Sequence, residues 1–395
     1  MKRLVSLLLI FVFVVSFAGC QTVESISLYA TQILNLFSSS TDWDNEIAVE
    51  LTDIGSNTKY YFNRLSNREK HAYNNILEQV NYLPEKIEIP MLDSESLTTV
   101  YESLLFDNPM LIQLDRSCNI VSIGKESFFT TEYVLSQEEY ISKTSEIQEA
   151  VDSILSTMPE NLSDYEKELY IHNEIIKRCS YKNDNNPDES TVYGALVNGY
   201  AACEGYSKSA KLLLDMCGIE AFVLAGKSIN SKGDVEGHMW NVVNINGDYY
   251  HLDLTWDDPV TQEKSERPRH TFFNLTDEEI SKTHSDFEMI YECNATEENY
   301  FKKEGLHFDK YSDEVRSKIS QLIAENINAN KKNIEIRFSS KKVYESAISG
   351  LFDKGEVYRI LSVADISTEA NMNTTETSYI KNDDFYVIDI FLIYK

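Results

Sequence analysis

An Asn-Gly dipeptide, Asn246-Gly247, lies between two runs in which apolar and polar residues alternate. Such a pair between alternating runs is the strongest short-range signal for a β-hairpin, because the tight loop requires positive φ values that these residues tolerate. A two-residue loop makes Ile245 face Asp248, and counting outward places Trp240 opposite Asp253. The dipeptide therefore predicts both a hairpin and the register of its two strands.

This register predicts which side chains share a face of the hairpin. Side chains alternate along a strand, so His238, Trp240 and Asp253 are expected on one face. His238 and Asp253 are then diagonal neighbours, roughly 7–8 Å apart at the backbone, which lets an imidazole hydrogen bond to a carboxylate. His251 is expected to point to the opposite face and to serve the structure. The hairpin thus supplies a histidine oriented by a carboxylate.

A cysteine stands where a helix is predicted to begin, upstream of the hairpin. Cys203 lies in Gly-Tyr-Ala-Ala-Cys-Glu-Gly-Tyr, residues 199–206, and Gly218 closes the helix predicted over 203–216. One interpretation is packing, because free cysteine is among the most buried residue types. The other is reactivity, because a helix N-terminus favours the thiolate and its amides can hold a developing oxyanion.

The rest of the chain mixes helical and strand patterns without internal repeats, which predicts an α+β fold. Capping boxes mark two helix starts, Ser66 with Glu69 and Ser163 with Glu166. Helices are predicted over 65–83, 94–106, 137–157, 164–178, 203–216 and 340–352. Strands are predicted over 110–114, 120–123, 221–224, 333–338, 357–363 and 385–394.

Three stretches together resemble the core motifs of the transglutaminase-like superfamily. They are Ala-Cys-Glu-Gly-Tyr-Ser (202–207), followed by Gly218-Ile219; Gly-His-Met-Trp-Asn (237–241); and Tyr-His-Leu-Asp-Leu-Thr-Trp-Asp-Asp-Pro (250–259). The resemblance covers roughly residues 135–293, and three ordered motifs are far more specific than one. It implies a core like that of papain-like cysteine proteases, in which a helix carrying the nucleophile packs on an antiparallel sheet.

The same resemblance implies a role for each of three residues and needs no cofactor or metal. Cys203 is the implied nucleophile, His238 the base and Asp253 the orienting carboxylate. These residues could in principle bind zinc, but structural zinc sites use closely spaced ligand pairs, and the sequence has no Cys-x-x-Cys pair. We therefore expect Cys/His/Asp chemistry on peptide or glutamine-type amides, through a thioester.

Two departures from animal transglutaminases bear on the reaction. Those enzymes carry a tryptophan directly after the cysteine and another well upstream that helps to hold the oxyanion. Here Glu204 follows Cys203, and no tryptophan lies between Trp43 and Trp240. We expect hydrolysis rather than amine transfer, with the oxyanion donor left open. A surface scaffold that keeps the fold without the chemistry is an alternative of another class.

The first twenty residues are typical of an export signal. Lys2 and Arg3 precede an apolar run over 4–17, and Phe-Ala-Gly-Cys ends the run at Cys20, which resembles a bacterial lipobox. An uncleaved anchor is the alternative, but about 14 apolar residues fall short of the ~20 that span a bilayer. We expect lipid attachment at Cys20 and a membrane-tethered protein on the extracytoplasmic face.

Charge and composition restrict the partners. The net charge of −28 disfavours nucleic acid, because phosphate binding requires a basic face. A peptide or protein substrate is expected, cell-wall associated ones included. We divide the chain into a signal peptide (1–20), a Ser- and Thr-rich tether (21–51), an α+β region (52–134), a catalytic domain (135–295) and a C-terminal α+β domain (296–395).

Overall fold

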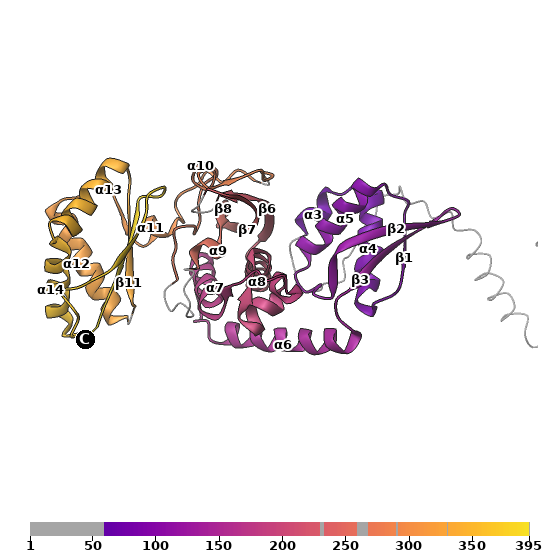
Figure 1. The fold of residues 1–395 in the computed structure, drawn as a ribbon, viewed down its shortest axis with the longest axis horizontal. Coiled ribbons are helices and arrows are strands. Elements are labelled where there is room, and N and C mark those ends of the chain that lie inside the picture. Colours follow the sequence, from indigo (N-terminus) through magenta and orange to yellow (C-terminus); the bar gives the residue numbers. More distant parts are fainter. Residues whose placement is uncertain (1–58, 230–232, 259–267, 290, 330, 395) are drawn as a thin grey trace, which may run out of the picture. The chain divides into compact units, whose positions relative to one another are not determined.

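The computed structural model describes residues 59–229, 233–258, 268–289, 291–329 and 331–394 (Figure 1). The signal peptide predicted over 1–20, with Cys20, and the tether predicted over 21–51 lie outside these residues. The described residues form helices and mainly antiparallel sheets, so the predicted α+β class is confirmed. None of their helices combines the length and the apolar character needed to cross a bilayer.

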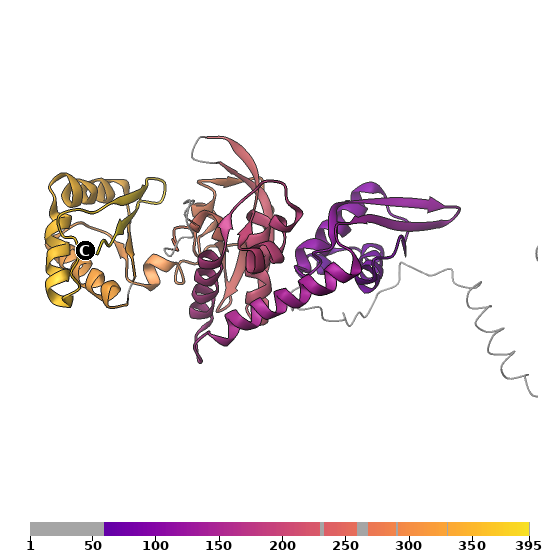
Figure 2. The same cartoon turned by 60° about the horizontal axis from the view of Figure 1, so that its bottom comes forward.

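The described residues from 59 to 134 form helices and a three-stranded antiparallel sheet with a hydrophobic core of their own. The helices are α3 (Tyr60–Arg64), α4 (Asn67–Gln79) and α5 (Ser94–Asp107). The strands are β1 (Ile87–Ile89), β2 (Leu114–Ile123) and β3 (Glu126–Tyr133), in the order β1-β3-β2. Figure 2 shows β2 and β3 as a long ribbon. The predicted capping box of Ser66 and Glu69 begins α4.

Strand β2 corrects the prediction of two short strands over 110–114 and 120–123. Its pairing with β3 shifts between Leu114 and Cys118, where Asp115 Oδ1 accepts a hydrogen bond from Ser117 N. This turn-like contact is accommodated within the strand because β3 pairs with β2 on both sides of it. The chain reverses instead at Gly124, where φ is +69°.

The central part packs the helix that begins at Cys203 against an antiparallel sheet, as the resemblance implies. The helix is α8 (Cys203–Met216). The sheet has the order β8-β7-β6-β9, with β6 (Ala221–Ile229), β7 (Val235–Ile245), β8 (Asp248–Leu252) and β9 (His284–Ser285). Around it lie α6 (Gln137–Ser156), α7 (Asp164–Arg178), the short α9 (Leu254–Asp257) and α10 (Asp277–Ile280), and the short parallel pair β4 (Ser180–Tyr181) and β5 (Tyr200–Ala201).

Helix α8 is buried along most of its length, including two lysines. Lys211 Nζ donates to Asp215 Oδ2 at 2.9 Å and to Ala221 O at 2.8 Å, so its charge is compensated inside the core. Lys208 Nζ lies 2.8 Å from Glu204 Oε1. A helix enclosed in this way holds its N-terminus in one place, which is where Cys203 stands.

The hairpin of β7 and β8 has the predicted register. Ile245 pairs with Asp248, and the ladder continues to Asn241 opposite Leu252. Asn246 and Gly247 both have positive φ, 57° and 95°, as a two-residue loop of this kind requires. Strand β8 ends at Leu252, so Asp253 lies just beyond the ladder.

The C-terminal part has a four-stranded sheet with helices to one side of it in Figure 1. Its strands are β10 (His307–Phe308), β11 (Asn333–Phe338), β12 (Tyr379–Asn382) and β13 (Val387–Phe391), and its longer helices are α12 (Asp313–Asn328), α13 (Lys341–Ile348) and α14 (Glu356–Thr368). Here the strand predicted over 357–363 is wrong, because these residues belong to α14. The buried residues of α14, Val357, Ile360, Leu361 and Ala364, have helical spacing.

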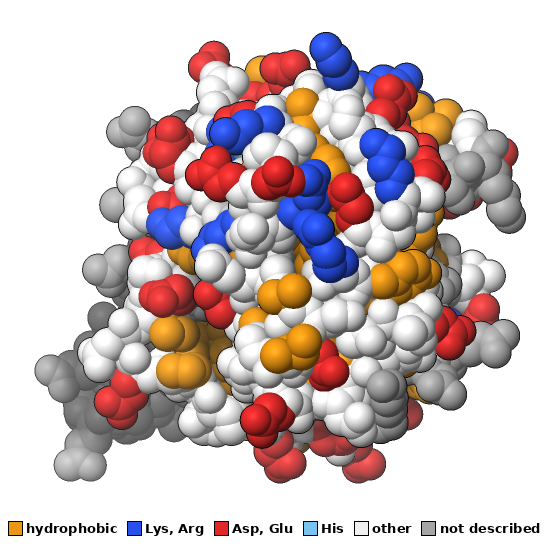
Figure 3. Space-filling model, turned by 90° about the vertical axis from the view of Figure 1, so that its left-hand side faces the viewer, with side chains coloured by type: hydrophobic (Ala, Val, Ile, Leu, Met, Phe, Trp, Pro, Cys, Tyr) orange, Lys and Arg blue, Asp and Glu red, His pale blue; other side chains and the backbone are white. Residues whose placement is uncertain are grey.

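The surface carries charges of both signs. On the face shown in Figure 3, Lys and Arg side chains are interspersed with Asp and Glu side chains. Examples of exposed ion pairs are Lys227 with Asp286, 2.7 Å apart, and Lys310 with Glu314, 3.4 Å apart. Because exposed pairs contribute only about 0–1 kcal/mol each, the fold is stabilised mainly by its buried cores.

Candidate active site

Cys203 is the first residue of α8. The residue before it, Ala202, caps the helix in an extended conformation with φ −84° and ψ 176°. The first backbone bond of the helix runs from Tyr206 N to Ala202 O at 3.2 Å, so the amides of Cys203, Glu204 and Gly205 precede it. Such amides form the positive end of the helix. Amides in this position can hold an anion beside Cys203.

Gly205, two residues after Cys203, allows a close approach of two backbone segments. A Cβ atom on Gly205 would lie 2.7 Å from Glu189 O and 2.8 Å from the Cβ of Ala201. Both separations are too short for ordinary contact, so the start of α8 can pack against the 187–191 segment only with glycine here. The Ala202 amide adds a hydrogen bond to Glu189 O at 2.8 Å.

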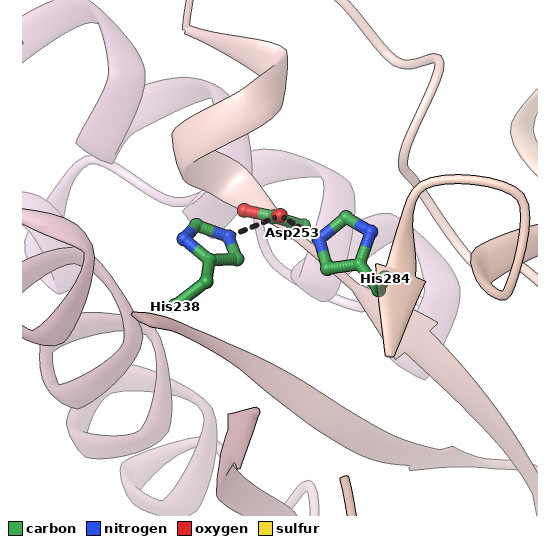
Figure 4. A group of neighbouring side chains, drawn as sticks. All are labelled: His238, Asp253 and His284. Carbon is green, nitrogen blue, oxygen red and sulfur yellow. Dashed lines mark hydrogen bonds and ion pairs between the residues drawn. The ribbon is translucent and has the colours of Figure 1, made fainter. Parts of the chain in front are cut away.

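His238 and Asp253 form the predicted hydrogen bond. His238 Nε2 lies 2.7 Å from Asp253 Oδ2 (Figure 4). Asp253 is the N-cap of α9, and its Oδ1 accepts from Thr255 N at 3.0 Å and from Trp256 N at 3.2 Å. The two residues meet as the hairpin register predicts, although Asp253 is held by a helix start and not by the strand.

The electrostatic surroundings favour a protonated His238. Burial alone would lower its pKa, but the Asp253 carboxylate and the Cys203 thiol outweigh burial and raise it to about 10. Burial would raise the pKa of Asp253, yet His238 and a second histidine, His284, lower it. Cys203 lies near enough to affect the imidazole, and since Nε2 of His238 is taken by Asp253, Nδ1 is the ring nitrogen left for the thiol. The structure therefore brings Cys203, His238 and Asp253 close together.

His284 is the residue of this site that sequence reasoning missed. Its Nε2 lies 3.0 Å from the same oxygen of Asp253, and it comes from β9, which pairs with β6 on the side away from the hairpin (Figure 4). The two-residue strand β9 has no periodic pattern. Only the long-range pairing of Ser228 with His284 places the ring beside Asp253.

His251 does not point to the opposite face, which corrects the prediction. Trp240 Nε1–H donates to His251 Nδ1 at 3.0 Å, so both rings lie on the same face of the sheet. The alternation of side chains itself requires this, because His251 precedes Asp253 by two positions. His251 Nε2 faces Asp277 Oδ1 at 2.9 Å, and burial lowers the pKa of the imidazole.

Two clusters offer atoms of the kind that bind metals, His238, Asp253 and His284 in one and His251, Asp277 and Cys293 in the other. In the first, the two N···O separations of 2.7 and 3.0 Å are hydrogen-bond lengths. Ligand atoms around tetrahedral zinc lie farther apart, about 3.3 Å for bonds near 2.0 Å. In the second, burial raises the pKa of the Cys293 thiol, which disfavours the thiolate that zinc requires. Hydrogen bonds account for both clusters.

Asp257 and Asp258, at the end of α9, are buried and join neighbouring helices. Tyr206 OH donates to Asp258 Oδ2 at 2.5 Å, and His172 Nε2 lies 3.2 Å from Asp257 Oδ2. These contacts tie the segment that carries Asp253 to α8 and α7.

None of the five cysteines in the described part of the chain forms a disulfide. They are Cys118, Cys179, Cys203, Cys217 and Cys293.

Residues 153–254 match the family model of the transglutaminase-like superfamily. The match runs from within α6 to the first residue of α9 and includes Cys203, His238 and Asp253. The chain thus contains a transglutaminase-like domain, and the resemblance seen in its motifs is confirmed over this segment. No curated protein matches the chain.

Solved structures with a detectable likeness are distant. A TGase shares 15% identity over 45% of this chain and 50% of its own, with a TM-score of 0.27. A candidate cysteine protease from Cytophaga hutchinsonii shares 12% over 35% of this chain and 61% of its own, with a TM-score of 0.23. A candidate protease from Parabacteroides distasonis shares 13% over 35% and 39%, with a TM-score of 0.19. The chain covers half the length of the TGase.

Proposed function

We propose that this protein is a thiol enzyme that cleaves amide bonds of peptides or proteins through Cys203, His238 and Asp253. The observation that carries the proposal is the hydrogen bond of 2.7 Å between His238 and Asp253, close to a cysteine at the N-terminus of α8. A nucleophile, a base and a group that orients the base are the parts that covalent acyl transfer requires.

The proposed reaction has two steps, formation of a thioester and its hydrolysis. The Cys203 thiolate attacks the carbonyl carbon, the C–N bond breaks, and His238 Nδ1 gives its proton to the leaving amine, which leaves a thioester. Water then attacks the thioester carbon as His238 Nδ1 takes its proton, and the C–S bond breaks. The products are an amine and a carboxylic acid, and the thiolate and imidazolium are restored. Asp253 holds the imidazole and stabilises its charge throughout.

The oxyanion of each tetrahedral intermediate would be held by amides at the start of α8. Tyr181 is a candidate for a second donor, because β4 pairs it with Ala201, two residues before Cys203. Burial raises the pKa of Tyr181, and so does the nearby Cys203. A raised pKa keeps the phenol protonated, as a donor must be.

Hydrolysis is favoured over amine transfer. The position after the cysteine, a tryptophan in animal transglutaminases, is Glu204, and its carboxylate is engaged in ion pairs with Lys208 and Arg116. We also propose that the chain is exported and anchored by a lipid on Cys20, so that its substrates are extracytoplasmic proteins or peptides of the cell surface. Neither proposal requires a cofactor.

Turnover by the full chain and by Cys203→Ala tests this function, with Cys217→Ala as the matched control because Cys217 caps the other end of α8. A library of quenched fluorescent peptides detects hydrolysis, and incorporation of a labelled amine into protein detects amine transfer. Activity in the wild type and in Cys217→Ala, abolished in Cys203→Ala, is expected. Turnover unchanged in Cys203→Ala would refute the mechanism. Peptide binding without turnover in all three would favour the scaffold.

A further inference from the structure

One oxygen of Asp253 receives two imidazoles. Oδ2 lies 2.7 Å from His238 Nε2 and 3.0 Å from His284 Nε2, and the rings approach it from opposite sides in Figure 4. Oδ1 is occupied by the amides of Thr255 and Trp256. Four donors therefore surround a carboxylate that is fully buried.

The ring of His284 is itself held on every side. Its side chain is fully buried, and its Nδ1 lies 2.9 Å from Thr283 Oγ1. The rings of Trp240 and Trp256 pack against it, with centroids 4.8 and 4.9 Å away. Backbone pairing of β9 with β6 fixes the strand that carries it. Because the His284 ring cannot move, its hydrogen bond restricts the orientation of the Asp253 carboxylate.

We propose that His284 is a positioning residue of the active site, which acts through Asp253 to hold His238 in line with Cys203. The proposal rests on the proposed function, since it concerns the same site. With His284 present, Oδ2 cannot turn away from the plane that His238 needs. Without His284, Oδ2 keeps only the hydrogen bond to His238. The carboxylate can then rotate about Oδ1, which the amides of Thr255 and Trp256 hold. As a result, Nδ1 of His238 loses its alignment with the thiol.

The hydrogen-bond chemistry assigns the tautomer of His284. A carboxylate accepts and does not donate, so Nε2 of His284 must carry a proton. In the neutral ring Nδ1 is then an acceptor, 2.9 Å from the hydroxyl oxygen of Thr283. His284 therefore stabilises the ionised form of Asp253 and takes no part in moving the proton of the reaction.

Two substitutions separate the hydrogen bond from the bulk of the ring. In His284→Gln, the longer side chain can place an amide N–H near the position of Nε2 and so still donate to Asp253. In His284→Asn, the shorter amide reaches only the position of Nδ1, beside Thr283. His251→Gln and His251→Asn are matched controls, because His251 is also buried on the same sheet but bonds Asp277 instead.

The measurement is the pH dependence of iodoacetamide alkylation at Cys203, followed by mass spectrometry on the full chain, with His238→Ala as the reference. His284→Asn should slow alkylation near pH 6 by about tenfold and move the profile toward that of His238→Ala. His284→Gln and both His251 variants should keep the wild-type profile. A wild-type profile in folded His284→Asn would overturn the proposal, as would an equal loss in folded His284→Asn and His284→Gln.

A second measurement needs no variant. The ¹⁵N resonances of the wild-type histidines should show His284 with its proton on Nε2, and an Nδ1–H tautomer would overturn the proposal. Alkylation and tautomer are measured without any substrate. A protein that turns over no amide would therefore refute the proposed function while leaving these two results to decide the role of His284.

Discussion

The hydroxyl of Tyr206 lies 2.5 Å from Asp258 Oδ2, which joins α8 to the segment directly after α9. Both side chains are buried. Because Cys203 begins α8 and Asp253 caps α9, this bond links the two elements that bear the proposed nucleophile and the carboxylate. The geometry of the site therefore depends on a contact outside it.

Tyr206→Phe should destabilise the fold by about 1–3 kcal/mol, because a buried carboxyl loses its hydroxyl donor. Burial raises the pKa of Asp258 to about 6, although the hydrogen bond from Tyr206, the Tyr181 backbone and the charge of Arg269 oppose this rise. Urea unfolding followed by circular dichroism gives the free energy. Asp258→Asn is the matched control, since the amide oxygen still accepts from Tyr206, and it should lose less. A greater loss of stability in Asp258→Asn than in Tyr206→Phe would show that the charge of the carboxylate, and not its hydrogen bond from Tyr206, contributes the stability.

Asp253→Asn should reduce kcat/KM by about 10²–10⁴-fold, because an amide neither fixes the tautomer of His238 nor stabilises its charge. Asp253 contributes to holding the pKa of His238 at about 10. The leaving amine needs the protonated ring, so activity is lost as pH rises through this pKa. The basic limb of the kcat/KM profile should therefore move to lower pH in Asp253→Asn. An unmoved basic limb would assign that limb to another group.

Gly205→Ala should destabilise the fold by about 1–3 kcal/mol and impair alkylation of Cys203, because the added Cβ meets Glu189 O at 2.7 Å and forces the helix start to shift. Gly237→Ala is the control from the histidine motif, since a Cβ there meets nothing within 4 Å. Thermal unfolding measures the stability of the two variants, and iodoacetamide labelling measures the alkylation rate of Cys203 in each. If Gly237→Ala were the more damaging change, the packing argument would fail.

Glu335→Gln should change how stability varies with pH. Burial raises the pKa of Glu335, on β11, to about 8, and its Oε2 lies 2.7 Å from His270 Nδ1. In the unfolded chain the pKa is about 4.3, so the folded state binds more protons between these values and stability falls as pH rises through that window. The glutamine variant should lack this fall, so it should gain on the wild type within that window and keep the gain above pH 8. Urea unfolding at several pH values checks it, and parallel curves would contradict it.

Several local features could be predicted because neighbouring residues alone produce them. The capping boxes of Ser66 and Ser163 each need only a hydroxyl and a glutamate three residues on, and both are present as expected. Residues 357–363 show where this local reasoning stops. A short apolar run fits a strand or a buried helix, and only the core against which α14 packs distinguishes the two.

The sequence by itself determined the hairpin, its register and the start of α8, because a tight turn and a helix cap are decided by residues a few positions apart. From these the meeting of His238 with Asp253 followed. Only the tertiary structure decided that His284 shares an oxygen of Asp253 and that Cys203 lies close to His238. Each of these two contacts joins segments far apart along the chain. The pairing of β9 with β6 places His284, and the packing of α8 on the sheet places Cys203.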